Sequence, residues 1–111
     1  MTEVGLQSNT QKTILLVGLG NIGFRHLEGL LKSKSFLEVH LVDIDERGLS
    51  KAKQLVEKLS HDMQHKIIYR NSIPKGKEYD VAILATNADV RKDLVKDLLK
   101  KSNCKFLILE K

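Results

Sequence analysis

Apolar residues along this chain follow two different spacings. Unbroken apolar runs of strand length lie at residues 13–18, 37–43, 66–69, 80–86 and 105–110. Runs without polar alternation are typical of strands in a parallel sheet that helices cover on both faces. Between these runs, apolar residues recur at helical spacing over residues 21–33, 46–60 and 88–102. The pattern therefore predicts an alternation of strands and helices.

The lengths of these segments match βαβ units, whose crossovers are right-handed. We therefore expect one α/β domain over residues 12–111, a Rossmann-type doubly wound parallel sheet with strand order 3-2-1-4-5. Residues 70–79 depart from the alternation, since they contain Pro74 and Gly76 and predict a loop with at most one helical turn. Residues 1–11 are polar, show no signal-peptide pattern, and are interpreted as a disordered leader.

The junction between the first strand and the first helix reads GLGNIG over residues 18–23. Gly18 permits a tight turn, Gly20 leaves room for a pyrophosphate beside the backbone, and Gly23 lets the helix pack close to the sheet. Free N–H groups at the positive end of the helix dipole then stabilise the phosphates. A glycine pattern alone also arises by chance, but here a strand precedes it and a helix follows it. The motif predicts a dinucleotide-binding turn.

An acidic residue, Asp43, follows the second apolar run and lies 20 residues after Gly23. At that spacing a carboxylate accepts hydrogen bonds from the adenosine ribose and repels the 2′-phosphate of NADP. The sequence therefore favours NAD over NADP. Two alternatives stay open: Asp43 is an acid that only flanks a helix, or Arg47, just beyond it, holds a 2′-phosphate rather than lying exposed in the first helical turn.

Composition narrows the class of protein. The 111 residues are 41% hydrophobic and 30% charged, which is typical of a globular domain, and no apolar run approaches the roughly 20 residues needed to cross a bilayer. We expect a cytoplasmic protein. The net charge is +5, but acids and bases interleave over residues 89–101, with Asp97 and Lys101 at an i, i+4 spacing. This pattern indicates a solvated helix face rather than a nucleic-acid or membrane surface.

Cysteine and histidine positions exclude other chemistry. The single cysteine, Cys104, rules out an internal disulfide and a thiolate metal cluster, and beside a turn expected at Asn103 it is interpreted as a free structural thiol rather than a reactive one. Histidines at 26, 40, 61 and 65 lack metal-ligand spacing, so no metal site is expected. For His26 we favour packing or capping over catalysis. No grouping of serine, histidine and acid suggests a nucleophilic triad.

Four segments, residues 18–26, 42–45, 79–86 and 106–111, together resemble the glucose-fructose oxidoreductase, inositol dehydrogenase and rhizopine-catabolism (Gfo/Idh/MocA) family. The resemblance spans residues 12–111. It implies a nucleotide-binding domain of an oxidoreductase that transfers hydride between a sugar or polyol CH–OH group and NAD. Together with the glycine turn and the acid, it gives these cofactor-binding candidates: Gly18, Gly20, Asn21, Ile22, Gly23, Asp43, Ile44, Ala85, Thr86, Asn87 and Glu110.

The resemblance also assigns a role to the end of the chain. Glu110 and Lys111 match the family's Glu-Lys-Pro, whose lysine lies near the nicotinamide and the substrate, so Lys111 is the catalytic candidate. The family's second domain supplies the acid-base histidine and the dimer contacts, and this sequence resembles the front half of such an enzyme, expected to be inactive alone. Asn87 and Arg91 replace the family's usual proline and histidine, which puts the detailed contacts of that loop in doubt.

Two other functions compete with the oxidoreductase reading. A nucleotide-sensing regulatory domain of the kind that gates potassium transport shares the glycine turn and the acid, but the ending at Glu110 and Lys111 favours the oxidoreductase. Methyltransferases that bind S-adenosylmethionine rarely show all three glycines at this spacing, so that alternative is weaker.

Overall fold

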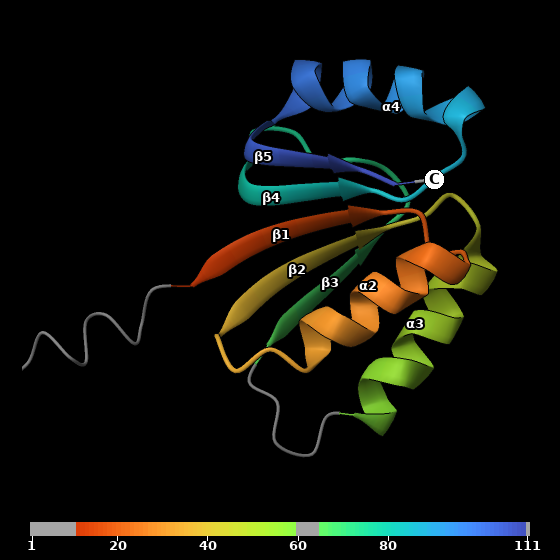
Figure 1. Ribbon diagram of the computed structural model, residues 1–111, viewed down its shortest axis with the longest axis vertical. Helices are drawn as coiled ribbons and strands as arrows, with labels where there is room; N and C mark the ends of the chain where they lie inside the picture. Colours follow the sequence, from red (N-terminus) through yellow and green to blue (C-terminus); the bar gives the residue numbers. More distant parts are fainter. Residues whose placement is uncertain (1–10, 60–64, 111) are drawn as a thin grey trace, which may run out of the picture.

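The computed structural model describes residues 11–59 and 65–110, which form a parallel sheet with helices on both faces (Figure 1). Helices α2 and α3 cover one face, and α4 covers the other. The elements are β1 (Lys12–Val17), α2 (Asn21–Leu31), β2 (Leu37–Val42), α3 (Glu46–Lys58), β3 (Lys66–Arg70), β4 (Glu78–Leu84), α4 (Ala88–Lys101) and β5 (Asn103–Leu109).

The strand order of the five-stranded sheet is β3-β2-β1-β4-β5, and every neighbouring pair is parallel. The predicted doubly wound α/β fold is therefore confirmed. The strand β1 lies at the centre, with β2 on one side and β4 on the other. The chain leaves β1 toward one edge and later returns to build the other edge. Ligands of such sheets bind at this change of direction, outside the carboxyl ends of the strands.

The core has two layers because successive residues of a buried strand point to opposite faces. Ile14 and Leu16 pack with Leu27 of α2 and Ala52 of α3, whereas the neighbouring residues of β1 pack on the other face with Leu98 of α4. This burial on both faces explains why the strands read as unbroken apolar runs.

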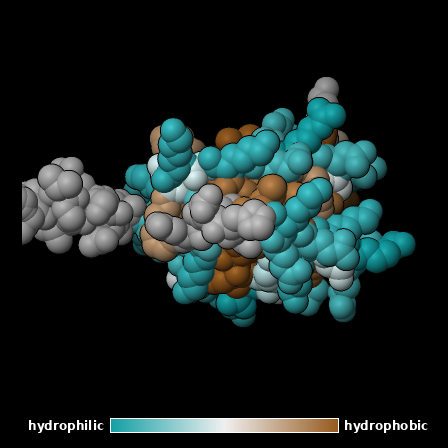
Figure 2. Space-filling model, turned by 90° about the horizontal axis from the view of Figure 1, so that it is seen from below, coloured by the Kyte–Doolittle hydropathy of each residue, from teal (hydrophilic) through white to brown (hydrophobic). Residues whose placement is uncertain are grey.

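Charged residues at the helix ends support the two longer helices. Asp45 caps α3 by accepting the N–H of Arg47 at 2.9 Å, and Glu46 adds negative charge to the first turn. In α4 the predicted pair forms, with Lys101 Nζ 3.3 Å from the Asp97 carboxylate. In Figure 2, hydrophilic side chains surround the face shown, and hydrophobic side chains are visible between them. No described helix is long and apolar enough to span a membrane.

The crossover between β3 and β4 is a loop over residues 71–77, which confirms the prediction of a loop there and contains no helical turn. Its Ile73 is buried, and the Pro74 carbonyl accepts the hydroxyl of Ser102 at 2.7 Å. Gly76, at φ 73°, donates its N–H to the carbonyl of Lys101 at 2.7 Å. The loop is thus tied to the end of α4.

Several predicted boundaries were wrong by one or two residues. Asn103 does not mark a turn but opens β5, where it pairs with Glu78 and donates its N–H to the carbonyl of Lys77 at 2.9 Å. The strand β4 begins at Glu78 and ends at Leu84, two residues earlier than predicted at each end. Its start was missed because the polar residue Glu78 takes part in the ladder. The helices α2 and α4 end at Leu31 and Lys101, before the predicted residues 33 and 102.

Candidate functional site

The turn after β1 requires glycine at two positions. Gly18 has φ 95°, and a Cβ there would lie 2.6 Å from the carbonyl oxygen of Ala85. At Gly23 a Cβ would overlap the carbonyl oxygen of Gly18. Gly23 therefore lets α2 pack against the turn itself and the end of β4, rather than against the sheet at large. The turn is compact because neither residue has a side chain.

Gly20 has a different role. It is the N-cap of α2 in an ordinary extended conformation, φ −77° and ψ −161°, and nothing lies within 4 Å of a Cβ built on it. No described side chain caps α2, whose first backbone bond runs from Phe24 N–H to the carbonyl of Gly20 at 2.8 Å. The N–H groups of the first turn, from Asn21 and Ile22 onward, lack carbonyl partners within the helix. Open space beside such groups suits an anion.

Asp43 follows β2 directly and contacts this turn. One oxygen of its carboxylate, Oδ2, accepts the N–H of Leu19 at 2.9 Å, and the other, Oδ1, accepts the N–H of Asp45 at 2.9 Å. The acid after β2 thus holds the turn after β1 in place. Sequence spacing predicts that Asp43 lies near the turn, but not that it binds the turn's backbone.

Arg47 lies in the first turn of α3, and its side chain is 88% exposed. Its guanidinium binds both oxygens of Asp45, with Nη2 3.0 Å from Oδ2 and Nε 3.2 Å from Oδ1. Hydrogen bonds from Arg47 hold the pKa of Asp45 below its usual value. The bond from the Arg47 side chain contributes most, and the bond from its backbone N–H contributes next. The arginine that could meet a 2′-phosphate is therefore already paired.

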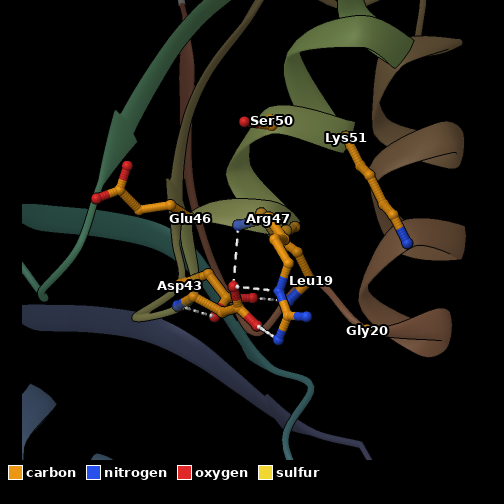
Figure 3. Close-up of a pocket in the computed structure, with 9 residues that line it drawn as sticks. Leu19, Gly20, Asp43, Glu46, Arg47, Ser50 and Lys51 are labelled. Carbon is orange, nitrogen blue, oxygen red and sulfur yellow. Dashed lines mark hydrogen bonds and ion pairs between the residues drawn. The ribbon is translucent and has the colours of Figure 1, made fainter.

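Two cavities meet at the glycine turn, and Leu19, Gly20 and Asp43 line both. The larger, about 690 Å³, extends along α3 past Arg47, Ser50 and Lys51 (Figure 3). The other, about 410 Å³, extends across the carboxyl edge of the sheet and includes these predicted residues: Gly18, Ile44, Ala85, Thr86 and Asn87. Asn21, Ile22, Gly23 and Glu110 do not line either cavity.

Thr86, in the loop between β4 and α4, presents a polar atom that lacks a partner. Its Oγ1 is buried and has no hydrogen-bond partner among the described residues. The next residue, Asn87, is the N-cap of α4, where its side chain makes no capping bond. Buried polar atoms are normally satisfied. The open space at Gly20, beside the free N–H groups at the start of α2, fits a polar ligand such as a dinucleotide.

His26 and Glu110 form a pair that the sequence did not reveal. His26 Nε2 lies 2.9 Å from Glu110 Oε2, and both side chains are partly exposed. The N–H of Glu110 also donates to the carbonyl of Leu84 at 2.9 Å. His26 thus links α2 to the residue that follows β5. Lys111, the catalytic candidate, lies outside the described residues.

Away from the cavities, His40 is fully buried between Glu38 and Tyr79. Cys104 is free and half-buried, and burial raises the pKa of its thiol, which agrees with a structural rather than a reactive role. The described residues contain no group of three or more side chains arranged to hold a metal ion.

Comparison with known proteins identifies the family. No curated protein and no solved structure matched the chain. A family model described as an oxidoreductase family with an NAD-binding Rossmann fold, Gfo/Idh/MocA, matched residues 12–111. That range covers the whole described sheet, the glycine turn and Asp43. The chain therefore belongs to the Gfo/Idh/MocA oxidoreductase family, and its Rossmann domain is of the kind that binds a nicotinamide cofactor.

Proposed function

We propose that residues 12–111 bind NAD as the nucleotide-binding domain of an oxidoreductase that acts on a CH–OH group of a sugar or polyol. The observation that carries this proposal is the fixed carboxylate of Asp43 beside the open space at Gly20. Asp43 is positioned to accept ribose hydroxyls while the first turn of α2 meets the pyrophosphate. When bound, the cofactor accepts or donates the hydride.

The other residues have supporting roles in this proposal. Ile44 and Ala85 contribute apolar walls to the smaller cavity. Thr86 and Asn87 line the same cavity, in the loop that by resemblance to the family borders the nicotinamide ribose. Glu110, held by His26, leads to Lys111, which we propose positions the hydroxyl being oxidised. The family resemblance supports a second domain that supplies the base and makes homo-oligomer contacts. A cytoplasmic location belongs to the same proposal and agrees with the unpaired cysteine.

Titration calorimetry of the chain with NADH and with NADPH tests the proposal. We expect NADH to bind and NADPH to bind more weakly, because a fixed carboxylate repels a 2′-phosphate. If neither nucleotide binds a chain that circular dichroism shows to be folded, the proposed function is wrong. If both bind equally well, nucleotide binding stands and Asp43 loses its role in selection.

A further inference from the structure

Both oxygens of the Asp43 carboxylate are held by hydrogen bonds. Its two oxygens each accept one backbone N–H, from Leu19 on one side and Asp45 on the other, at 2.9 Å in both cases. A carboxylate has about four lone-pair sites, so each oxygen keeps one for a further donor. The group therefore has one orientation and still has capacity to bind two ribose hydroxyls.

This orientation depends on a residue that the motif does not include. Gly48 lies in the first turn of α3, and a Cβ built on it would lie 2.8 Å from Asp43 Oδ2 and 3.3 Å from Leu19 Cβ. A contact of 2.8 Å is shorter than van der Waals distance, so one group has to move. The end of the Asp43 side chain is the part that moves most easily, and its movement would break the bond to the N–H of Leu19.

Gly48 is not needed for its backbone conformation. It has no positive φ, and its N–H donates to the carbonyl of Asp45 at 3.1 Å as in an ordinary first turn. Alanine is a better helix former than glycine, so the glycine weakens α3. Its visible benefit is the room that it leaves for the carboxylate.

We propose that Gly48 is a positioning residue for nucleotide selection, because it lets Asp43 take the doubly held orientation that favours a ribose with a free 2′-hydroxyl. This rests on the proposed function. A carboxylate held in this way cannot rotate aside to admit a 2′-phosphate. Arg47, in the first turn of α3, is bound to Asp45.

Gly48→Ala tests the proposal, with Gly29→Ala as the matched control. Gly29 also lies in a helix, α2, and a Cβ built on it meets nothing within 4 Å. Gly29→Ala should unfold at a higher temperature than the parent, because it gains helix propensity. Gly48→Ala gains the same propensity but loses the bond between Asp43 and Leu19, so its unfolding temperature should lie below that of Gly29→Ala. Only Gly48→Ala should bind NADH more weakly, by roughly 5- to 30-fold, since it displaces charged hydrogen-bond acceptors. Its preference for NADH over NADPH should fall as well.

Two further measurements separate this proposal from the proposed function. In an Asp43→Ala background, adding Gly48→Ala should change NADH affinity by less than about twofold, because the carboxylate that it displaces is already absent. In nucleotide-free protein, the amide NMR signal of Leu19 should move in Gly48→Ala and stay in place in Gly29→Ala. Unchanged NADH affinity and preference in Gly48→Ala would overturn the positioning role while leaving nucleotide binding intact. Loss of binding in the parent would overturn both.

Discussion

The hydroxyl of Tyr79 lies 2.9 Å from Nδ1 of His40, and the two rings meet edge to face at 84°. The other ring nitrogen, Nε2, lies 2.7 Å from the Glu38 carboxylate. A carboxylate only accepts, so Nε2 donates its proton to Glu38. Both ring nitrogens of His40 thus have hydrogen-bond partners inside the core. Burial raises the pKa of Tyr79 to about 12.

This raised pKa predicts a loss of stability in alkali. Tyrosine in the unfolded chain ionises at its ordinary value of 10.0, while Tyr79 in the folded chain stays neutral up to about 12. Its contribution is complete below pH 10 and disappears as the pH rises toward 12. Two pKa units correspond to about 2 to 3 kcal/mol of unfolding free energy. Urea denaturation at a series of pH values measures this loss.

Tyr79→Phe separates this contribution from the titration of other groups. At neutral pH the variant should be less stable by about 1 to 3 kcal/mol, because it leaves Nδ1 of His40 buried without a hydrogen-bond partner. Its deficit relative to the parent should shrink between pH 10 and 12, where the parent loses the contribution of Tyr79. Parallel pH profiles for parent and variant would contradict the assignment.

Asp43→Ala should weaken NADH binding roughly 10- to 100-fold, because it removes hydrogen bonds from a charged acceptor. NADPH affinity should fall less, since the variant also removes a repulsive charge, so the preference for NADH narrows. Fluorescence titration measures both constants. Asp93→Ala, at an exposed site on α4, also removes one negative charge, but away from the turn. It should leave the dissociation constants of NADH and NADPH unchanged. Equal losses in the two variants would point to net charge rather than to the site.

Gly20→Val should abolish detectable nucleotide binding without unfolding the chain. The backbone of Gly20 is in a conformation that any residue adopts, and nothing within 4 Å opposes a Cβ, so the fold tolerates the substitution. The valine would occupy the space that the pyrophosphate needs. Circular dichroism should match the parent. Gly29→Val, at an equally open helix position, should retain binding. Full affinity in folded Gly20→Val would place the nucleotide elsewhere.

The sequence predicts the sheet order and the glycine turn because both depend on local patterns: apolar runs, helical spacing and glycine positions. It misses the start of β4, because the strand opens with the polar residue Glu78, which pairs with Asn103 of β5. Hydropathy alone does not distinguish such a residue from one in a loop.

The same limit explains what was missed at the site. The pair of His26 and Glu110 joins residues 84 positions apart, and nothing in the local pattern of either indicates the other. The bonds from Leu19 and Asp45 to Asp43 depend on the exact approach of two loops. Spacing predicts which loops meet, whereas side-chain contacts follow only from the assembled sheet.

The 111-residue chain alone should catalyse no measurable hydride transfer, even with NAD bound. Hydride transfer requires the donor carbon to lie about 3 to 3.5 Å from the nicotinamide while a base takes the hydroxyl proton. The family resemblance implies that the base and most substrate contacts come from a second domain. At this edge of the sheet the cavities are open, so a bound substrate would face water and lose the low-dielectric enclosure that strengthens charge stabilisation.

An absorbance assay for NADH formation over inositols, aldoses and nucleotide sugars tests this expectation. If the coding region extends beyond Lys111, the longer product is assayed beside the 111-residue chain, at equal concentrations and with NADH binding measured for both. Activity of the longer product alone is the expected result. Turnover by the 111-residue chain would show that its own residues complete the site. Inactivity of both, with NADH still bound, would favour a nucleotide-sensing domain, because binding would then be the whole of the function.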